Sequence, residues 1–281
     1  MDIALLKTFL EVAKRRHFGK AAETLCITQS AVSARIKLLE TQLGVPLFLR
    51  NRKEIQLTPA GNRLLGHAES IVRNWERARH DIALEPAFSS MLFLGSSLDL
   101  WQILLRERVW RLRQLLPETA LRIECYSGEL LVRRLNEHLL DLVFLFEPPL
   151  LPGLETEQVS EIPLVLVASR RGLSVEAAMS HNHILVDWGS AFAQRHAELF
   201  ADLPAPAIQV NAGTLALDLL EGMQGSAYLS RAMVQERLEQ GSLFLVEEAP
   251  VIGRFAFAVY NPGNQRMELI RQALSDLRSP L

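Results

Sequence analysis

The spacing of hydrophobic residues near the start of the chain predicts three short helices. Apolar side chains between residues 2 and 15 recur with a helical period, and the small residues Ala21 and Ala22 give the next helix a face that another helix can approach closely. A third helix is bounded by Thr28 as a candidate N-cap and by Gly44 as a candidate C-terminal stop. Its apolar stripe is formed by Val32, Ile36, Leu39 and Leu43. The pattern therefore predicts a helix, a tight turn and a second helix between residues 18 and 44.

The face of the third helix opposite this stripe is small, polar and basic. An ideal helical wheel places on it Ser30, Ala34, Lys37 and Thr41, with Gln29, Ser33 and Arg35 on its flanks. Small residues allow a helix to lie close in a DNA groove, where amides, hydroxyls and guanidinium groups can reach base edges and phosphates. We therefore predict base contacts from the three flank residues, with Ser30 near the groove floor and Lys37 on the DNA backbone.

A basic strand–turn–strand follows this helix. Phe48 and Leu49 are apolar, residues 50–53 read Arg-Asn-Arg-Lys, and Ile55 and Leu57 alternate as in a strand. A basic loop beside a recognition helix acts as a wing that adds phosphate or minor-groove contacts. The alternative is a solvated charge run on a small helical domain. We favour the wing, with DNA contacts from Arg50, Arg52 and Lys53.

From residue 59 to residue 85 the pattern predicts one long helix. Its apolar residues recur at spacings of four and three over nearly three heptads, and they are Leu64, Ala68, Ile71, Trp75, Ala78 and Ile82. Such a seam favours pairing with a second copy of the helix. The alternative is an amphipathic helix that packs on its own domain. Pro86 should end the helix, which makes residues 86–90 the predicted hinge.

Beyond residue 91 strands and helices alternate, which predicts an α/β domain with mostly parallel sheets. A first βαβαβ run covers residues 91–146, and a second series covers residues 164–277. Two open sheets in series imply a cleft between them, because ligands bind at the carboxyl ends of parallel strands. The predicted lobes are about residues 91–162 with 261–281 for lobe I, and about residues 163–260 for lobe II.

Polar residues at the predicted strand ends are the candidate effector contacts in this cleft. They are Ser96, Ser97, Tyr126, Ser127, Ser169, Trp188, Ser190, Asn211 and Thr214. Hydroxyl groups beside free helix N–H groups favour an anionic or carbonyl-bearing ligand, and Arg122 and Arg170 are candidates to neutralise it. Simple N-capping is the alternative for each residue alone. As a set that maps to one cleft, they favour effector binding.

The distribution of charge supports a nucleic-acid partner, although the net charge of −2 does not. Residues 1–60 hold ten Lys and Arg against five Asp and Glu, whereas the remainder holds 20 against 27. A basic head on an acidic body is expected of a protein that binds double-stranded DNA at one end. The composition, 49% hydrophobic and 22% charged, fits two or three folded domains in 281 residues.

The sequence contains no strong motif for catalysis or metal binding. The G-x-S-x-G pattern fails at Asp99, and there is no GxxxxGK[ST], no GxGxxG after a strand and no HExxH. His181 and His183 form a weak metal signal, and we favour surface histidines. Cys26 and Cys125 suit a reducing cytosol and a structural role. With no apolar run of 18 residues and no signal peptide, we expect a cytoplasmic non-enzyme without metal or cofactor and without membrane contact.

The run HFGKAAETLCITQSAVSARIKLLETQLGVPLFLRNRKEIQLTPAG resembles the DNA-binding domain of LysR-type transcriptional regulators. The resemblance rests on the AA pair, QSAVS, the LE, LG and LF pairs, Arg50 and LTPAG, and it covers roughly the first 65 residues without a gap. Residues 91–281 resemble the family more loosely, through LVRRLNEHLLDLVF and EGMQGSAYLSRAMVQERLEQGSLFLV. Ser230 stands where the family has proline, and Ala227-Tyr228 replaces an aliphatic run.

The resemblance implies a winged helix-turn-helix at residues 1–58, a linker and dimerisation helix at 59–85, and a two-lobed effector domain like a periplasmic binding protein at 91–281. It also implies dimers through the linker helix, a tetramer, and an effector of unknown identity. RNA polymerase is a further expected partner. The predicted function is therefore a sequence-specific DNA-binding transcriptional regulator under effector control. The alternative is a ligand-independent architectural DNA-binding protein with a vestigial cleft.

Overall fold

The structure is a computed structural model that describes residues 2–50, 55–82, 85, 87–180, 182–201, 206 and 208–278. The chain forms two compact units, residues 1–85 and residues 86–281, and each is described by itself. Three positions of the predicted wing and hinge, Arg52, Lys53 and Pro86, lie outside the described residues, as does the side chain of Arg50.

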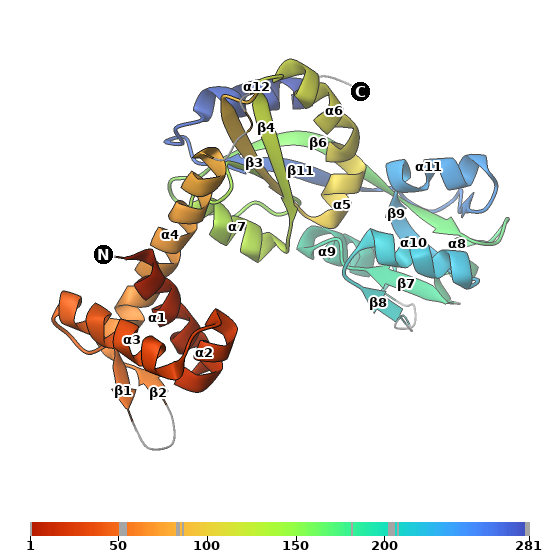
Figure 1. Ribbon diagram of the computed structural model, residues 1–281. Helices are drawn as coiled ribbons and strands as arrows, with labels where there is room; N and C mark the ends of the chain where they lie inside the picture. The colour runs from red at the N-terminus through yellow and green to blue at the C-terminus, as the bar shows by residue number, and fades with distance from the viewer. Residues whose placement is uncertain are drawn as a thin grey trace. The chain divides into compact units, whose positions relative to one another are not determined.

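The first unit is a bundle of three helices with a two-stranded antiparallel ribbon and one long helix (Figure 1). Its elements are α1 (Ile3–Arg15), α2 (Phe18–Leu25), α3 (Gln29–Leu43), β1 (Phe48–Arg50), β2 (Ile55–Leu57) and α4 (Pro59–Ile82). Phe9, Ala21 and Ile36 are fully buried in its core, so each of the first three helices contributes its apolar face. This is the winged helix-turn-helix arrangement that the hydrophobic pattern predicts.

Local sequence sets the ends of α3. The Thr28 hydroxyl accepts a hydrogen bond from the Ala31 N–H at 3.2 Å, and Gly44 closes the helix with φ +70°. Val32, Ile36 and Leu39 are fully buried, as the predicted stripe requires. Leu43 is the exception, because its side chain in the last turn is 41% exposed. The predicted stripe is therefore one residue too long.

The second unit is built on one continuous mixed sheet of nine strands with helices packed on it (Figure 1). Its strands are β3 (Ser90–Ser96), β4 (Thr119–Cys125), β5 (Leu142–Leu145), β6 (Glu155–Ala168), β7 (His183–Val186), β8 (Ile208–Val210), β9 (Ser226–Ser230), β10 (Phe244–Leu245) and β11 (Ile252–Tyr260). Its helices are α5 (Leu98–Leu100), the π-helical turn η1 (Trp101–Leu105), α6 (Arg106–Leu115), α7 (Gly128–Asn136), α8 (Val175–Ser180), α9 (Ser190–Leu199), α10 (Gly213–Gly222), α11 (Arg231–Glu239) and α12 (Met267–Arg278).

The sheet runs in the order β4-β3-β5-β11-β6-β9-β7-β8, with β10 beside β6. We call the part with β3, β4 and β5 lobe I and the part with β7, β8 and β9 lobe II. Strands pair in parallel inside each lobe, whereas β6 and β11 pair antiparallel with each other and connect the lobes. The two separate sheets expected from the sequence are therefore one sheet, and the predicted lobe boundary at residues 162–163 falls inside β6.

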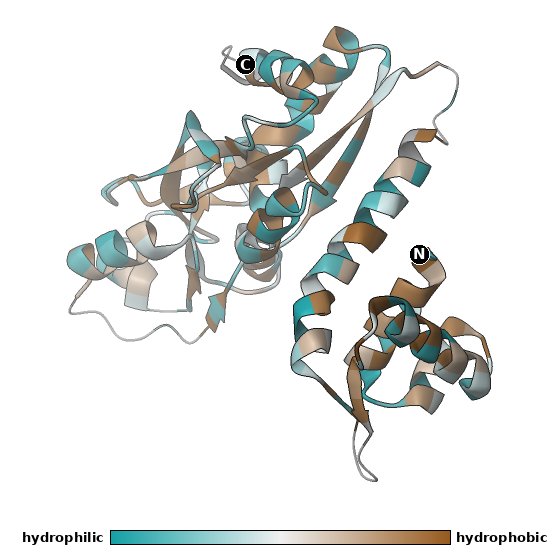
Figure 2. Ribbon diagram, turned by 90° about the vertical axis from the view of Figure 1, so that its left-hand side faces the viewer, coloured by the Kyte–Doolittle hydropathy of each residue, from teal (hydrophilic) through white to brown (hydrophobic). Residues whose placement is uncertain are grey.

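The strands of the second unit are mostly apolar, as Figure 2 shows by their brown colour. Their side chains form the main core, which spans both lobes and includes Phe144, Leu166 and Tyr228. The helical segment at residues 98–115 is interrupted by η1, which follows the short helix α5 that carries Asp99. Among the helices described, none is both long enough and apolar enough to span a membrane.

Candidate nucleic-acid interface and interlobe junction

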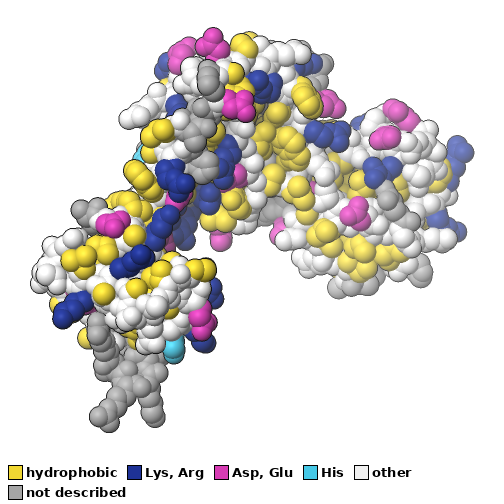
Figure 3. Space-filling view, viewed as in Figure 1, with side chains coloured by type: hydrophobic (Ala, Val, Ile, Leu, Met, Phe, Trp, Pro, Cys, Tyr) yellow, Lys and Arg dark blue, Asp and Glu magenta, His cyan; other side chains and the backbone are white. Residues whose placement is uncertain are grey.

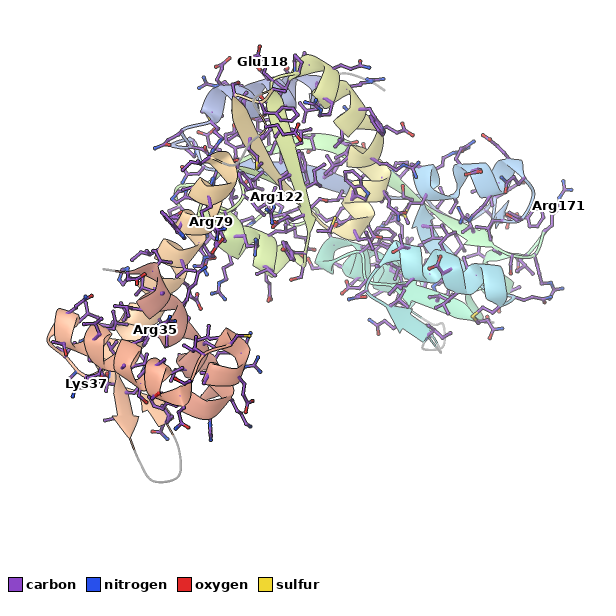
Figure 4. All side chains as sticks on the ribbon, in the orientation of Figure 1. Arg35, Lys37, Arg79, Glu118, Arg122 and Arg171 are labelled. Atoms are coloured by element: carbon purple, nitrogen blue, oxygen red, sulfur yellow. The ribbon has the colours of Figure 1, made fainter. Side chains whose placement is uncertain are left out.

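The exposed face of α3 carries the polar residues that the helical wheel predicts. Gln29, Ser30, Lys37 and Thr41 are all exposed, and Ser33 is half-buried. Lys37 lies at the outer surface of the unit (Figure 4), and further Lys and Arg side chains are spread over the same unit (Figure 3). Because the opposite face is fixed in the core, this row of amide, hydroxyl and ammonium groups is presented on a rigid element.

Arg35 is placed differently from the other predicted reading residues. Its side chain is half-buried, and its Nη1 donates to the Thr8 hydroxyl of α1 at 3.4 Å. Thr8 is itself fully buried and donates to the Ala4 carbonyl. This bond directs the guanidinium toward α1. A base contact by Arg35 stays a prediction.

Two residues that sequence analysis did not single out hold the helix-turn-helix and the wing together. The Glu40 carboxylate accepts hydrogen bonds from the N–H groups of Leu47 at 2.8 Å and Phe48 at 3.3 Å, which ties β1 to α3. The Thr58 hydroxyl donates to the Pro46 carbonyl and accepts from the Gly61 N–H. These bonds give a physical reason for the glutamate of the LE pair and the threonine of LTPAG.

The predicted seam on α4 divides into two halves. Ala68 is fully buried, and Leu64 and Ile71 pack against the core of the first unit. Trp75 is 47% exposed and Ile82 84% exposed, with Ala78 half-buried between them. Figure 2 shows the resulting bands of polar and apolar residues along this helix. The first half therefore packs on its own domain, as the alternative interpretation expects, and the second half presents apolar side chains to solvent. Dimerisation through this seam stays a prediction.

At the junction of the lobes, Asp99 of lobe I binds the N-terminus of α10 in lobe II. Its two carboxylate oxygens accept from the Gly213 N–H at 3.0 and 3.1 Å, and Oδ1 lies 3.4 Å from the Thr214 N. The Asp99 side chain is buried. Burial raises the pKa of this carboxyl above its ordinary value, while the hydrogen bonds from Gly213 and Thr214 lower it.

Glu147, which follows β5 in lobe I, binds the N-terminus of α9 in the same way. Its Oε1 accepts from the Ser190 N–H at 2.5 Å and from the Ser190 hydroxyl at 2.7 Å. Arg254 of β11 lies 3.5 Å from the same oxygen. Partial burial raises the pKa of Glu147, but the bonds from Ser190 and the charge of Arg254 outweigh it, so the pKa lies below its ordinary value.

Two aromatic rings and one guanidinium group lie between the Asp99 contact and the Glu147 contact. The Trp188 ring packs so closely on Gly213 that a Cβ there would lie 2.6 Å from it, and it meets Phe146 edge-on at 5.8 Å. Phe146 in turn lies under the Arg254 guanidinium at 5.5 Å. Trp188 is buried and its indole N–H donates to the Tyr228 carbonyl. Its place favours a packing role over the predicted effector contact.

The predicted effector residues do not all meet at this junction. Thr214 and Ser190 lie at the helix N-termini bound by Asp99 and Glu147, and Ser97 caps α5 beside Asp99 through the Leu100 N–H at 3.2 Å. Ser96 is fully buried beneath them. Ser97 is an N-cap and Ser96 belongs to the core, whereas Ser190 and Thr214 lie in the first turns of α9 and α10. Effector binding by these four residues stays a prediction.

Three further predicted residues have surroundings of their own. The Ser169 hydroxyl donates toward the Gly225 carbonyl and accepts from the Gly225 N–H, in a separate hollow of about 340 Å³. Tyr126 lies under the Arg134 guanidinium at 4.7 Å, and the neighbouring Ser127 is exposed. Asn211 is exposed after β8. No interaction at these positions points to a shared ligand.

Two basic candidates for an anion site have other surroundings. Arg122, which lies on β4 (Figure 4), pairs through its Nε with the Glu124 carboxylate at 2.8 Å. Arg170 is exposed in the turn after β6. The Arg122 guanidinium is therefore paired with a carboxylate of the chain itself, and its role in binding an anion stays a prediction.

A buried aromatic cluster in lobe II corrects the expectation of surface histidines. His183 is 4% exposed and stacks on His196 at 5.8 Å, and Phe192 and Tyr228 pack around His196. Burial, together with the charge of His196, lowers the pKa of His183 to about 4. Burial also raises the pKa of Tyr228 to about 12. His181, the other member of the weak metal signal, lies outside the described residues.

The remaining candidate chemistry is sparse. The described part of the chain contains no group of three or more His, Cys, Asp or Glu side chains that could hold a metal ion. Cys26 and Cys125 are free and exposed, and the structural role expected of them stays a prediction. Cys26 ends α2 with φ +54°.

Comparison with known proteins agrees with these two units. The profile of the family described as "Bacterial regulatory helix-turn-helix protein, lysR family" matches residues 3–62, and that of the "LysR substrate binding domain" matches residues 87–279. The chain is 35% identical over 273 residues to the HTH-type transcriptional regulator HdfR of Salmonella dublin, and equally to that of Salmonella typhimurium. Each alignment covers 96% of this chain and 96% of the relative.

Solved structures share the fold over the whole length. The LysR family regulator CbnR superposes with a TM-score of 0.71 at 18% identity, covering 99% of this chain and 98% of that one. Vibrio fischeri DarR, solved in complex with DNA, superposes with a TM-score of 0.63 at 21% identity, covering 100% and 99%. The helix-turn-helix unit, the lobed α/β domain and the full-length match to HdfR lead to one conclusion: this chain belongs to the LysR family of bacterial transcriptional regulators.

Proposed function

We propose that this chain reads a specific double-stranded DNA sequence with the exposed face of α3. The observation that carries the proposal is the row of Gln29, Ser30 and Lys37 on a helix whose other face is locked in the core. Gln29 is suited to a bidentate contact with adenine, and Lys37 to a phosphate. Ser33 and Arg35 complete the proposed reading set, and Arg50, Arg52 and Lys53 form the proposed wing.

The active form is proposed to be at least a dimer. Trp75 and Ile82 are exposed apolar residues on the second half of α4, where a partner helix would cover them. A two-fold dimer places two reading helices on half-sites one helical turn of DNA apart, or a multiple of that spacing. The further assembly to a tetramer follows from the family resemblance, and RNA polymerase is the proposed partner during activation or repression.

The interlobe junction is the proposed sensor, controlled by a small molecule of unknown identity. A second candidate, an architectural DNA-binding protein with no effector, is favoured by the carboxylates that already occupy the junction. A thermal-shift panel of metabolites separates the two candidates. A ligand present at 100 times its Kd stabilises by about 2.7 kcal/mol. A hit supports the sensor, and a silent panel supports the architectural protein.

Genome-wide mapping of bound DNA, followed by footprinting, tests the DNA-reading role. We expect bound sites that share one sequence with two related half-sites. Binding without any shared sequence would contradict specific reading by α3. Sedimentation at micromolar concentration tests the assembly, because a purely monomeric protein would contradict the dimer.

A further inference from the structure

The two helices of lobe II that begin at the interlobe junction start without an N-cap side chain of their own. The residue before α10 is Ala212 and the residue before α9 is Gly189, and neither makes a side-chain cap hydrogen bond. An α-helix leaves its first N–H groups without partners and carries partial positive charge there. Such an end favours an anion, so the sequence leaves two anion positions at the start of α9 and α10.

In this structure both positions are filled by the chain's own carboxylates. Asp99 binds the first N–H groups of α10, and it lies 114 positions away in the sequence. Glu147 binds the first N–H and the hydroxyl of Ser190, 43 positions away. Both carboxylates come from lobe I and both helices belong to lobe II, so every one of these bonds crosses the junction.

The packing around the two carboxylates also crosses the junction. α5 packs against α10, and η1 packs against α11. Gly213 is held against Trp188, and the Thr214 hydroxyl is buried beside Asp99 with no hydrogen-bond partner among the described residues. The lobes are thus closed on each other around Asp99, and separating them would expose two uncapped helices and a buried carboxylate.

We propose that Asp99 and Glu147 are built-in ligands, which occupy the anion positions of lobe II, hold the lobes closed without an effector, and exclude small carboxylates from the junction. The proposal rests on the proposed role of this junction as the sensor, and it specifies the ligand class that the wild-type sensor rejects. A carboxylate ligand would have to displace Asp99 from buried hydrogen bonds and would meet the charge of Glu147 nearby. An effector for this chain is therefore neutral or cationic, or acts by releasing these carboxylates.

Chemical rescue tests the proposal in the full-length protein. Asp99→Ala removes the carboxylate and leaves a space at the start of α10 that formate can fill. Loss of charge-assisted hydrogen bonds in a domain of this size should lower the Tm of the effector domain by about 5–10 °C. Sodium formate should restore most of that loss relative to sodium chloride at equal ionic strength, whereas the wild-type Tm should respond equally to both salts.

Two further variants keep the result interpretable. Asp218→Ala removes an exposed carboxylate from the same helix α10, so neither its Tm nor its response to formate should differ from those of the wild type. Asp99→Asn keeps the shape of the side chain but not its charge, and it covers the case in which Asp99→Ala does not fold. Its Tm should fall less, and formate should not rescue it because the amide fills the space.

The outcomes are separable from those of the proposed function. If formate stabilises the wild type as much as Asp99→Ala, or if Asp99→Ala keeps the wild-type Tm, the carboxylate is not a built-in ligand and the inference fails. Binding of duplex DNA is measured on the same samples. If the wild type does not bind duplex DNA, the proposed function fails. Stabilisation of Asp99→Ala alone by formate would still support the proposal that Asp99 is a built-in ligand.

Discussion

In the first unit, α3 and α4 are capped by residues next to them in the sequence, whereas α9 and α10 at the lobe junction of the second unit are capped by distant carboxylates. Thr28 caps α3 through Ala31, and Thr58 binds the N–H of Gly61 in the first turn of α4. At the lobe junction, by contrast, α10 is capped by Asp99 from 114 positions away. A local cap persists wherever the helix moves, whereas a remote cap lasts only while two parts of the fold stay together. The caps of α3 and α4 thus lie within the first unit, whereas the caps of α9 and α10 require the two lobes to stay together.

This difference matches the tasks of the two units. A DNA reader needs fixed spacing between its side chains, which the core around Phe9 and Ile36 supplies. A sensor needs an element with two arrangements of similar free energy. The connecting strands β6 and β11 keep the lobes attached in one sheet, and the hydrogen bonds of Asp99 and Glu147 join the lobes at the junction.

Truncation of the reader's core is the largest expected effect. Phe9→Ala should lower the free energy of unfolding of the first unit by about 3–5 kcal/mol, because it removes a fully buried ring and leaves a cavity. Hydrogen exchange should show that this loss is confined to residues of the first unit. Leu38→Ala, at an exposed position of α3, is the matched control and should change stability by less than about 0.5 kcal/mol. An equal loss of hydrogen-exchange protection in both units would contradict the claim that the two units are stabilised separately.

Acid should weaken the second unit through His183, whose pKa falls to about 4 on burial. The folded state keeps this imidazole neutral, so stability is full above the ordinary pKa of 6.5 and is lost as the pH falls from 6.5 toward 4. A tenfold change in proton affinity corresponds to about 1.4 kcal/mol, which gives a loss on the order of 3 kcal/mol.

Urea unfolding of the effector domain between pH 7 and pH 4 measures this effect. His183→Gln should reduce the pH dependence over this range, whatever its stability at pH 7, and the remainder is expected from His196, whose pKa is also lowered by burial. A mutant curve parallel to that of the wild type would show that His183 is not the responsible group.

Loss of a local cap should have the smallest effect on stability. Thr28→Ala should destabilise the first unit by about 1 kcal/mol, because the hydroxyl that caps α3 is removed. Thr41→Ala, an exposed position within the same helix, is the matched control and should be close to neutral. Formate should not rescue Thr28→Ala, since a hydroxyl rather than a carboxylate is missing. If Thr28→Ala and Thr41→Ala lose the same stability, the Thr28 hydroxyl does not stabilise α3 as a cap.

The elements that sequence analysis located are those whose signals lie within one helix or strand. Thr28, Gly44 and the apolar stripe of α3 are separated by a few residues, so their periodicity and caps could be recognised directly. The first half of β6 was missed because residues 155–161 are mostly polar, and their strand conformation depends on pairing with β11. The first half of the α4 seam was assigned to a partner because periodicity does not say which surface covers a stripe.

The junction was only partly predictable for the same reason. Ser97, Ser190 and Thr214 were found because they lie at strand ends that open helices. Asp99 entered the sequence analysis only as the residue that breaks a catalytic motif. The sequence does carry one hint of a distant acceptor, because Ala212 and Gly189 have no side chain that could cap α10 and α9. Which carboxylate supplies it depends on the tertiary fold.

A binding titration of the mapped operator over a range of salt concentrations tests the central claim, that the exposed face of α3 reads DNA. Lys37→Ala should reduce the slope of log affinity against log salt by about one, and Gln29→Ala should reduce discrimination between operator variants by about 1–3 kcal/mol. Arg195→Ala, an exposed cation of lobe II, should change neither. If both α3 variants keep the wild-type slope and the wild-type discrimination, α3 is not the reading helix.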